Sequence, residues 1–466
     1  MRLLLISPEN DADYPEDPLR RGIYPPLGLL SIATYARTHC ADASVRVVDE
    51  NIAPTDDNAL ADADWVGIYA TSFNYGNALR LAEKAKDCGA NTVLGGPHAT
   101  ALAERILIRQ PAVDHVVKGE GEIALLRLMM DSKGALPAPN VLSRDGCGIV
   151  CGPAQELDIA RVPRIDRSFV DMEAYAANFR ARYPELPFAK PASVYSQKGC
   201  NWRTAARSCL FCARLERTVR TRSAHEVWAE IGELASREGA DCVWDVSDDV
   251  LTSKKYFVEF VRHRPPGLDV SLLLYARADG ITEETVSMLR QIGCHEVFIG
   301  LEAGDNAMLR AMGKGTTVEK NWRAVELLRA HGIAVFPSFV LASEGETADS
   351  LTRTAAFIER VVSQDGVHRF AVSVLLPLPG SRAFQKMIED PVLGAKYGGL
   401  DALNLAGLER DWVEHFTQVS YDYVKSLQCQ LRGLKQHASS FLDTKVARAD
   451  RATASAGFGR QAWAAK

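Results

Sequence analysis

The sequence lacks the signals of several protein classes. It has no uninterrupted run of about 18 apolar residues, so we expect no membrane-spanning helix. Its lysines and arginines form no long basic run and the net charge is −5, which argues against general nucleic-acid binding. Ten cysteines in 466 residues are too few for a disulfide-dense secreted protein, which favours a reducing, cytoplasmic location.

The chain does have enough apolar sequence to bury more than one core. Hydrophobic residues make up 47% and charged residues 24%, the balance of a globular protein. The length of 466 residues predicts about two to four domains. The short apolar run at residues 3–6 is followed by proline and acidic residues without a small-residue cleavage site. It is therefore interpreted as a first strand and not as a signal peptide.

Residues 1–130 alternate short apolar strands with helices. Strands are expected at 3–7, 45–49, 65–69, 91–96 and 113–117, with helices at 29–38, at 75–88 and from 123 onward. This alternation predicts an α/β domain with a doubly wound, Rossmann-like parallel sheet. Such sheets bind ligands beyond the carboxyl ends of their strands.

Glycines and small polar residues gather at those expected strand ends. Glycine lets a bulky ligand approach the backbone, and the N-terminus of a following helix can bind its polar groups. No G-x-G-x-x-G motif is present, so a dinucleotide is poorly supported. The candidate ligand-binding residues are Thr71, Ser72, Phe73, Asn74, Gly95, Gly96, His98, Gly119, Glu120 and Gly121.

Three short motifs, PPLG from Pro25, GGPH from Gly95 and GEGE from Gly119, follow one another across this sheet. Their order resembles the cobalamin-binding domains attached to radical S-adenosylmethionine (SAM) enzymes. The D-x-H-x-x-G motif of other cobalamin proteins is absent, so the resemblance implies cobalamin without a histidine ligand, its lower face against residues 71–75. His98 would touch the nucleotide tail or bond to backbone; Glu120 would contact the cofactor or cap the next helix.

Residues 131–190 are rich in proline, arginine and short breaks, with no helical period longer than two turns. We interpret them as a linker that packs between domains, with a hairpin at 141–150 around an Asp-Gly turn. Cys147 and Cys151 have C-x3-C spacing, but no third cysteine follows two residues later. A plain hairpin is therefore favoured over a metal-binding motif.

Three cysteines at C-x8-C-x2-C spacing, Cys200, Cys209 and Cys212, lie within one expected loop. Such a group indicates a metal site, with three unrelated thiols as the alternative. Structural zinc needs four protein ligands, and the nearest further candidate, His225, lies in an expected helix. An iron–sulfur cluster held by three cysteines leaves one iron free for another ligand.

Strand–helix alternation repeats over residues 191–385. Strands are expected just before Cys200 and at 241–246, 270–277, 296–302, 334–341 and 369–375, with helices at 224–238, 282–292, 318–331 and 347–362. Six parallel strands with outer helices predict a partial (β/α)6 barrel, whose chemistry lies at the carboxyl ends of its strands. Asp248, Asp249, Arg277 and Glu302 follow such ends, where a carboxylate and a guanidinium could hold an amino acid.

This second domain resembles a radical SAM enzyme. The resemblance is carried by the three cysteines, by Phe211 before the last of them, by the Arg-Ala-Asp sequence from Arg277 and by GLEAGD around Glu302. It implies a 4Fe-4S cluster on the cysteines, whose free iron chelates SAM so that reduction yields a 5′-deoxyadenosyl radical. It also implies that Phe211 neighbours the adenine and that Arg277 and Glu302 contact the ribose or methionine part. Asp248 would contact SAM or substrate, a helix cap or surface loop being the alternative.

The cysteine spacing departs from the usual C-x3-C-x2-C of that family by five additional residues. The added loop-closure cost is roughly 1 kcal/mol or less, so the three sulfurs can still reach one cluster. Within this insert, Trp202, Arg203 and Arg207 are expected to cover the cluster, to meet the substrate or to face solvent. The sequence does not decide among these.

From residue 386 to 466 the chain is expected to be helical, with a long helix at 411–433 that packs on a core and closes the barrel mouth. The end of the segment 447–466 is expected to be disordered. The resemblance implies a cobalamin-dependent radical SAM enzyme that methylates an unactivated carbon of a small molecule, such as a natural-product intermediate. Cobalamin-assisted cyclisation or rearrangement and a non-catalytic cobalamin-binding sensor are the alternatives. An electron donor such as flavodoxin or ferredoxin is the expected protein partner.

Overall fold

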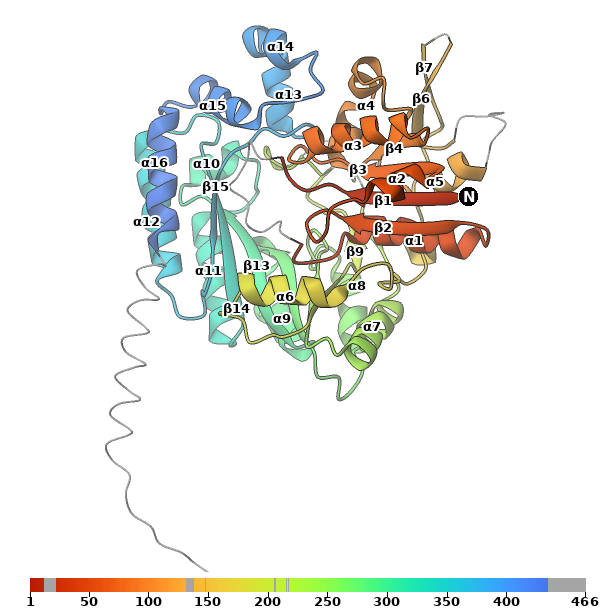
Figure 1. The fold of residues 1–466 in the computed structure, drawn as a ribbon. Coiled ribbons are helices and arrows are strands. Elements are labelled where there is room, and N and C mark those ends of the chain that lie inside the picture. Colours follow the sequence, from red (N-terminus) through yellow and green to blue (C-terminus); the bar gives the residue numbers. More distant parts are fainter. Residues whose placement is uncertain are drawn as a thin grey trace, which may run out of the picture.

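The computed structural model describes residues 1–11, 22–130, 138–146, 148–204, 207–214, 216 and 218–434. Two α/β units lie side by side, and a group of C-terminal helices packs next to them (Figure 1). The sequence-based expectations for Cys147 and for the segment 447–466 fall outside the described residues.

The N-terminal unit is built on a seven-stranded sheet in the order β2-β1-β3-β4-β5-β6-β7. Its parallel strands are β1 (Arg2–Ser7), β2 (Ser44–Asp49), β3 (Trp65–Tyr69), β4 (Asn91–Gly95) and β5 (His115–Val117). The intervening helices are α1 (Leu27–His39), α2 (Asp57–Ala61), α3 (Tyr75–Asp87), α4 (Pro97–Arg109) and α5 (Glu122–Met130). The order 2-1-3-4-5 is that of a doubly wound sheet, as predicted, and its switch point lies between β1 and β3.

The predicted hairpin forms, but it belongs to this sheet. β6 (Val141–Asp145) pairs antiparallel with β5, and β7 (Gly148–Cys151) pairs antiparallel with β6. The expectation of no long helix in the connecting segment is wrong, because α6 (Met172–Arg182) has 11 residues. Asp171 caps α6, and only Tyr175, Ala176 and Phe179 are buried, so its apolar stripe is too narrow to show as a period.

The second unit is a six-stranded parallel sheet in the order β15-β14-β13-β12-β11-β8, which confirms the predicted partial barrel. Its strands are β8 (Pro191–Val194), β11 (Cys242–Asp245), β12 (Ser271–Arg277), β13 (Cys294–Glu302), β14 (Ala334–Leu341) and β15 (Ala371–Val374). The helices are α7 (Ala224–Glu233), α8 (Lys254–Arg262), α9 (Glu283–Gln291), α10 (Asn306–Ala311), α11 (Val318–Ala330) and α12 (Ala348–Val362). The short strands β9 (Gln197–Lys198) and β10 (Arg220–Thr221) flank the cysteine segment as a separate ribbon.

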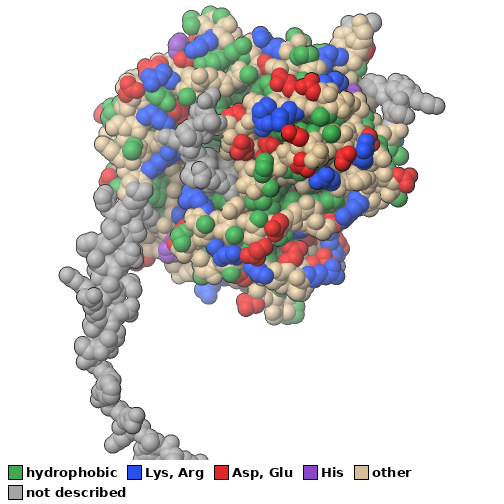
Figure 2. Space-filling view, viewed as in Figure 1, with side chains coloured by type: hydrophobic (Ala, Val, Ile, Leu, Met, Phe, Trp, Pro, Cys, Tyr) green, Lys and Arg blue, Asp and Glu red, His purple; other side chains and the backbone are tan. Residues whose placement is uncertain are grey.

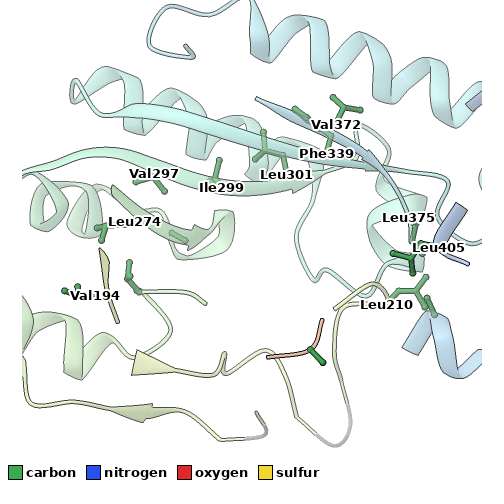
Figure 3. Close-up of a cluster of buried hydrophobic side chains, with 14 of the residues drawn as sticks. Val194, Leu210, Leu274, Val297, Ile299, Leu301, Phe339, Val372, Leu375 and Leu405 are labelled. Atoms are coloured by element: carbon green, nitrogen blue, oxygen red, sulfur yellow. The ribbon is translucent and has the colours of Figure 1, made fainter. Parts of the chain in front are cut away.

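Alternation along these strands separates two faces of the sheet. One face is a buried apolar layer against the outer helices, drawn in part in Figure 3; it includes Leu274, Val297, Ile299, Leu301, Phe339 and Val372. The other face lines the inside of the barrel in register-matched layers. One layer is Tyr275, Phe298 and Phe336, and the next toward the carboxyl ends is Arg277, Gly300 and Ser338. The inner face therefore passes from aromatic to charged as it approaches the mouth.

The C-terminal helices are α13 (Arg382–Glu389), α14 (Pro391–Tyr397), α15 (Leu405–Phe416) and α16 (Tyr421–Arg432). The single helix expected at 411–433 is wrong. Thr417 is extended at φ −122° and ψ 172°, and Ser420 caps α16 by accepting from the Tyr423 N–H. The Gln418 N–H donates to Glu346 O at 2.8 Å, so docking on the loop after β14 interrupts the helix.

No helix among the described residues is long and apolar enough to cross a membrane. On the face shown in Figure 2, basic and acidic side chains are interspersed over the surface.

Candidate functional site

The cysteine segment, residues 200–212, is anchored near its carboxyl end by Leu210, which is 1% exposed. The Leu210 N–H donates to Met312 O at 2.8 Å, and Leu210 O accepts from the Ala383 N–H at 3.0 Å. Its side chain lies beside Leu375 and Leu405 in the apolar core (Figure 3). These bonds hold Cys209 and Phe211, the two neighbours of Leu210, at the mouth of the barrel.

The three cysteines are free thiols and are partly buried. Two guanidinium groups face them: Arg203 Nη1 lies 3.4 Å from Cys212 Sγ, and Arg277 Nη1 lies 4.0 Å from Cys209 Sγ. Arg277 also interacts electrostatically with Cys200. Burial raises the pKa of the Cys209 and Cys200 thiols.

No group of three or more His, Cys, Asp and Glu side chains within the described ranges is preassembled around one metal ion. Soft sulfur donors with cations beside them nevertheless fit an iron–sulfur cluster, which thiolates hold and whose negative charge the guanidinium groups of Arg203 and Arg277 would balance. The donor chemistry of the segment therefore agrees with the cluster that the resemblance implied.

Trp202 and Arg203 of the insert lie against this group and are partly buried, whereas Arg207 is exposed. The Trp202 Nε1–H donates to Gly313 O at 2.7 Å. The guanidinium carbons of Arg277 and Arg207 lie 4.6 and 4.4 Å from the Trp202 ring centroid. Gly315 has φ +73°, and a Cβ there would come within 2.0 Å of the Trp202 ring, so this close approach requires glycine.

Arg277 is fixed in place at the end of β12. Its Nε and Nη2 donate to the two carboxylate oxygens of Asp279 at 3.0 and 2.9 Å. Nη2 also donates to Lys314 O at 2.6 Å. This fork geometry leaves Nη1 directed toward Cys209, which explains why an arginine and an aspartate stand two residues apart here.

Glu302 at the end of β13 is paired with Lys314, a residue that sequence reasoning missed. Lys314 Nζ donates to Glu302 Oε1 at 2.6 Å, and both side chains are buried. Burial opposes charge on Lys314, but the carboxylate outweighs it and the pKa of Lys314 is raised. The Lys314 ammonium also lies 5.9 Å from the Phe211 ring centroid. Arg277, Glu302 and Phe211 are thus brought together, and Lys314 joins them.

The backbone of Glu302 is left-handed, with φ +62°. A non-glycine residue in this region costs roughly 1–3 kcal/mol and is held there only by its surroundings. Here the bond to Lys314 holds it. A strained carboxylate at a strand end is the kind of outlier that clusters at functional sites.

The two aspartates after β11 have different surroundings. Asp248 accepts from the Gly199 N–H at 3.1 Å and pairs with Arg214 Nε at 3.0 Å. Asp249 is 4% exposed and accepts from the backbone N–H of Leu251 at 3.2 Å, and burial raises its pKa to about 6. Asp249 therefore caps a buried turn, which is neither the cofactor contact nor the helix cap or surface loop expected as the alternative. Asp248 stays at the mouth.

The carboxyl edge of the N-terminal sheet presents backbone and glycine. Asn74 Oδ1 accepts from the Thr71 N–H at 2.7 Å, which closes the loop after β3 at the switch point. Gly96 has φ +100°, and a Cβ there would lie 2.7 Å from Ala70 O. Gly119 has φ +81° and nothing within 4 Å of the position of a Cβ, which leaves room for a ligand.

Two predicted cofactor contacts are bonded within the protein. His98 is 2% exposed; Ser72 Oγ lies 2.8 Å from its Nδ1, and its Nε2 lies 2.8 Å from Asp401 O. Burial lowers the pKa of His98 to about 4, so the ring is neutral and Nε2–H donates to the carbonyl. Of the two roles expected for His98, contact with the nucleotide tail or a bond to backbone, the structure shows the bond to backbone.

Glu120 pairs with Lys198 at 3.0 Å and with Arg220 at 2.7 Å, both on the β9–β10 ribbon. Burial alone would raise the pKa of Glu120, but these cations lower it. The carboxylate therefore ties the N-terminal sheet to the cysteine segment of the barrel, a third outcome that neither of the two sequence-based alternatives foresaw.

Comparison with known families agrees with this division. A family model described as the B12 binding domain matches residues 20–129, and the model of the radical SAM superfamily matches residues 194–358. The chain therefore contains an N-terminal B12-binding domain followed by a radical SAM domain, and its cofactors are a 4Fe-4S cluster, SAM and cobalamin.

Individual relatives are distant. An uncharacterized methyltransferase from Pyrococcus horikoshii is 25% identical over 410 residues, covering 84% of each chain. The anaerobic magnesium-protoporphyrin IX monomethyl ester cyclase of Rubrivivax gelatinosus is 27% identical, covering 76% of this chain and 65% of the cyclase. The solved structure of the radical SAM methyltransferase TsrM from Kitasatospora setae, with cobalamin and a [4Fe-4S] cluster bound, has a TM-score of 0.67 at 18% identity, covering 83% of this chain and 78% of that one. This last likeness shows the shared fold.

Proposed function

We propose that this chain is a C-methyltransferase that acts on an unactivated carbon of a small molecule. The observation that carries the proposal is that the cysteine thiols, Arg277, Lys314 and Glu302 lie together at the barrel mouth. Glu120 connects this mouth to the glycine-rich edge of the other sheet. When bound, the three cofactors supply a 5′-deoxyadenosyl radical and a transferable methyl group. Two methyltransferases among the relatives support methyl transfer.

At the barrel mouth, Cys200, Cys209 and Cys212 hold the cluster. Arg277 lies against Cys209 and orients the charged end of SAM, while Phe211 packs on its adenine. The paired Lys314 and Glu302 offer one charge of each sign for its carboxylate, ammonium or ribose. Asp248, which faces Arg214 and the cysteine segment, contacts SAM or the substrate.

At the N-terminal sheet, the loop Thr71–Ser72–Phe73–Asn74 and the glycine turns at 95–96 and 119–121 would hold cobalamin. His98 would not be a ligand to it, because both of its ring nitrogens are already bonded. His98 joins the N-terminal unit to the C-terminal helical segment, and Glu120 joins it to the barrel unit, so both leave the cofactor contacts to their neighbours.

Reductive cleavage of SAM needs a one-electron donor, so a flavodoxin or ferredoxin is the partner of this activity. Figure 2 shows arginines and lysines interspersed with acidic residues on one face, and this mixed surface singles out no docking site.

The cluster assignment is tested by anaerobic reconstitution. Wild-type protein should bind about four irons per chain, and Cys209→Ala should lose them. Cys429→Ala, which changes an exposed thiol on α16, is the matched control and should keep its iron. A wild-type protein that binds cobalamin but no iron would favour the non-catalytic sensor.

Methyl transfer is tested with SAM labelled in its methyl group. The label should appear in the product, found by mass spectrometry. The similarity to a cyclase favours one alternative, a cobalamin-assisted ring closure, in which the product carries no label.

A further inference from the structure

The insert between the first and second cysteines contains one side chain that reaches the third. Arg203 Nη1 lies 3.4 Å from Cys212 Sγ and donates to Cys212 O at 3.3 Å. The Arg203 backbone N–H donates to Cys200 O at 2.9 Å. One residue of the insert is therefore bonded to both the first and the last cysteine of the segment.

The same two ends are also held together from outside the segment. Asp248 Oδ2 accepts from the Gly199 N–H at 3.1 Å, and Asp248 Oδ1 pairs with Arg214 Nε at 3.0 Å. Gly199 directly precedes Cys200, and Arg214 follows Cys212 by two residues. Each carboxylate oxygen keeps a further lone pair, so these bonds are compatible with the contact to SAM or substrate proposed for Asp248. Two independent bridges thus close the widened C-x8-C spacing.

Each of the three cysteine sulfurs has an N–H donor beside it. Burial raises the pKa of the Cys200 thiol, and the backbone N–H of Trp202, which bonds to that thiol, opposes the rise. Arg277 Nη1 lies 4.0 Å from Cys209 Sγ, and Arg203 lies beside the third sulfur. Two of the three donors therefore come from the insert, and Arg203 is the charged one of the two.

The other arginine of the insert lies elsewhere. Arg207 is exposed, and its guanidinium carbon lies 4.4 Å from the Trp202 ring centroid. Among the described residues, its side chain makes no bond to a cysteine. Arg203 and Arg207 thus carry the same charge on the same loop, but only Arg203 donates to a sulfur, so Arg207 provides a matched control.

A cation beside a cluster ligand changes the equilibrium between the two oxidation states of the cluster. Reduction adds one electron, and hence one negative charge, while no bond is made or broken. The one-electron donor proposed above supplies that electron. Hydrogen bonds to the sulfurs and the local charge help to set the potential of such clusters. Both favour the more negative, reduced state, and a charge-assisted bond does so more strongly than a neutral one.

We propose that Arg203 is a positioning residue for the cluster and that it also raises the reduction potential of the cluster. It bridges Cys200 and Cys212 across the insert, and its guanidinium stabilises the reduced state. The inference rests on the proposed function, because it takes the three thiols as cluster ligands. It gives a specific role to the insert, where the cysteine spacing departs from C-x3-C-x2-C.

The potential is measured by redox titration of the reconstituted protein without SAM, followed through the electron paramagnetic resonance signal of the reduced cluster. Arg203→Gln should lower the ratio of reduced to oxidised cluster at a fixed potential about tenfold, which is about 59 mV for a one-electron couple. Arg203→Lys keeps the charge and should lie between Arg203→Gln and wild type. Arg207→Gln should match wild type. An unchanged potential in Arg203→Gln, or an equal shift in Arg207→Gln, overturns the inference.

The bridge is tested separately on the cluster-free protein. Dibromobimane joins neighbouring thiols, and peptide mass spectrometry identifies the product that links Cys200 to Cys212. Arg203→Gln should lower the yield of this product, whereas Arg207→Gln should not. Equal yields in all three proteins overturn the bridging role. An Arg203→Gln variant that loads no iron, beside an Arg203→Lys variant that loads it fully, supports the bridge; loss of iron in both overturns the role of the charge.

This inference and the proposed function can fail separately. A wild-type protein that binds no iron contradicts the proposed enzyme, while cross-linking of the cluster-free chain still tests the bridge. A wild-type protein that loads iron, with a potential and a cross-linking yield that do not depend on Arg203, contradicts only the inference.

Discussion

The carboxyl edge of the N-terminal sheet and the mouth of the barrel solve different binding problems. The barrel mouth is dense in buried charge, with Arg277 held by Asp279 and with Lys314 held by Glu302. The other edge offers glycine turns, of which Gly96 admits no side chain. A small zwitterion beside an anionic cluster needs fixed charges, whereas a bulky corrinoid needs room and backbone groups. The difference between the edges thus matches the two kinds of cofactor.

The largest effect is expected when the buried ion pair between Lys314 and Glu302 at the barrel mouth is removed. Lys314→Met leaves Glu302 buried without a partner, which should lower the free energy of unfolding by about 3–5 kcal/mol and abolish SAM binding while cobalamin still binds. Chemical denaturation and equilibrium dialysis measure the two effects. Lys254→Met, which cuts the exposed pair with Glu284, should cost at most about 1 kcal/mol. An equal loss of unfolding free energy in both variants would show that burial does not make the Lys314–Glu302 pair more important than the exposed one.

The next largest effect is expected at the carboxyl edge of the N-terminal sheet, when a side chain is added at Gly96. Gly96→Ala forces a Cβ to within 2.7 Å of Ala70 O at a left-handed position, and should cost about 2–3 kcal/mol and weaken cobalamin binding while SAM still binds. In Gly89→Ala, at φ +84° with open space around it, only the backbone strain of about 1 kcal/mol remains. Unfolding midpoints and cobalamin titration separate these effects. Equal losses of stability and of cobalamin affinity in Gly96→Ala and Gly89→Ala would show that the contact with Ala70 O has no effect.

The contact of His98 with Asp401, which joins the N-terminal unit to the C-terminal helical segment, should make stability depend on pH. His98 has a pKa of about 4 in the folded protein and about 6.5 when unfolded, so the unfolded chain binds more protons between these values. Stability is therefore fully present above pH 6.5 and falls by roughly 1.4 kcal/mol per pH unit as the pH drops toward 4. Urea unfolding across this range measures the slope. His98→Gln should flatten it, and His39→Gln, at an exposed site, should not.

The smallest effect is expected at the insert. Trp202→Phe removes the Nε1 bond to Gly313 O but keeps a ring between Arg207 and Arg277, and should cost about 1 kcal/mol. Denaturation curves give this value, and iron content should be unchanged. Loss of iron in this variant would instead place Trp202 among the groups that hold the cluster.

The alternation of the chain predicted both sheets, and two strands, β3 and β14, have the predicted bounds 65–69 and 334–341. The side chains that the resemblance assigned to SAM, Phe211, Arg277 and Glu302, do lie together around Lys314. Lys314 itself was missed because a lysine between two glycines in a loop carries no period and no motif of its own. The break after Phe416 was missed because the backbone contact that causes it comes from Glu346, about 70 residues earlier in the chain.

Sequence alone determined the elements and the chemistry available to this protein: apolar periods fix strands and helices locally, and three cysteines near an arginine and a carboxylate fix a class of cofactor. Only the tertiary structure decided what each polar group does. His98 bonds to Asp401, Glu120 to Arg220, and the Tyr24 hydroxyl has no described partner. The physical reason is that a buried polar group must find its partner in space, and that partner is set by packing between elements far apart in the chain.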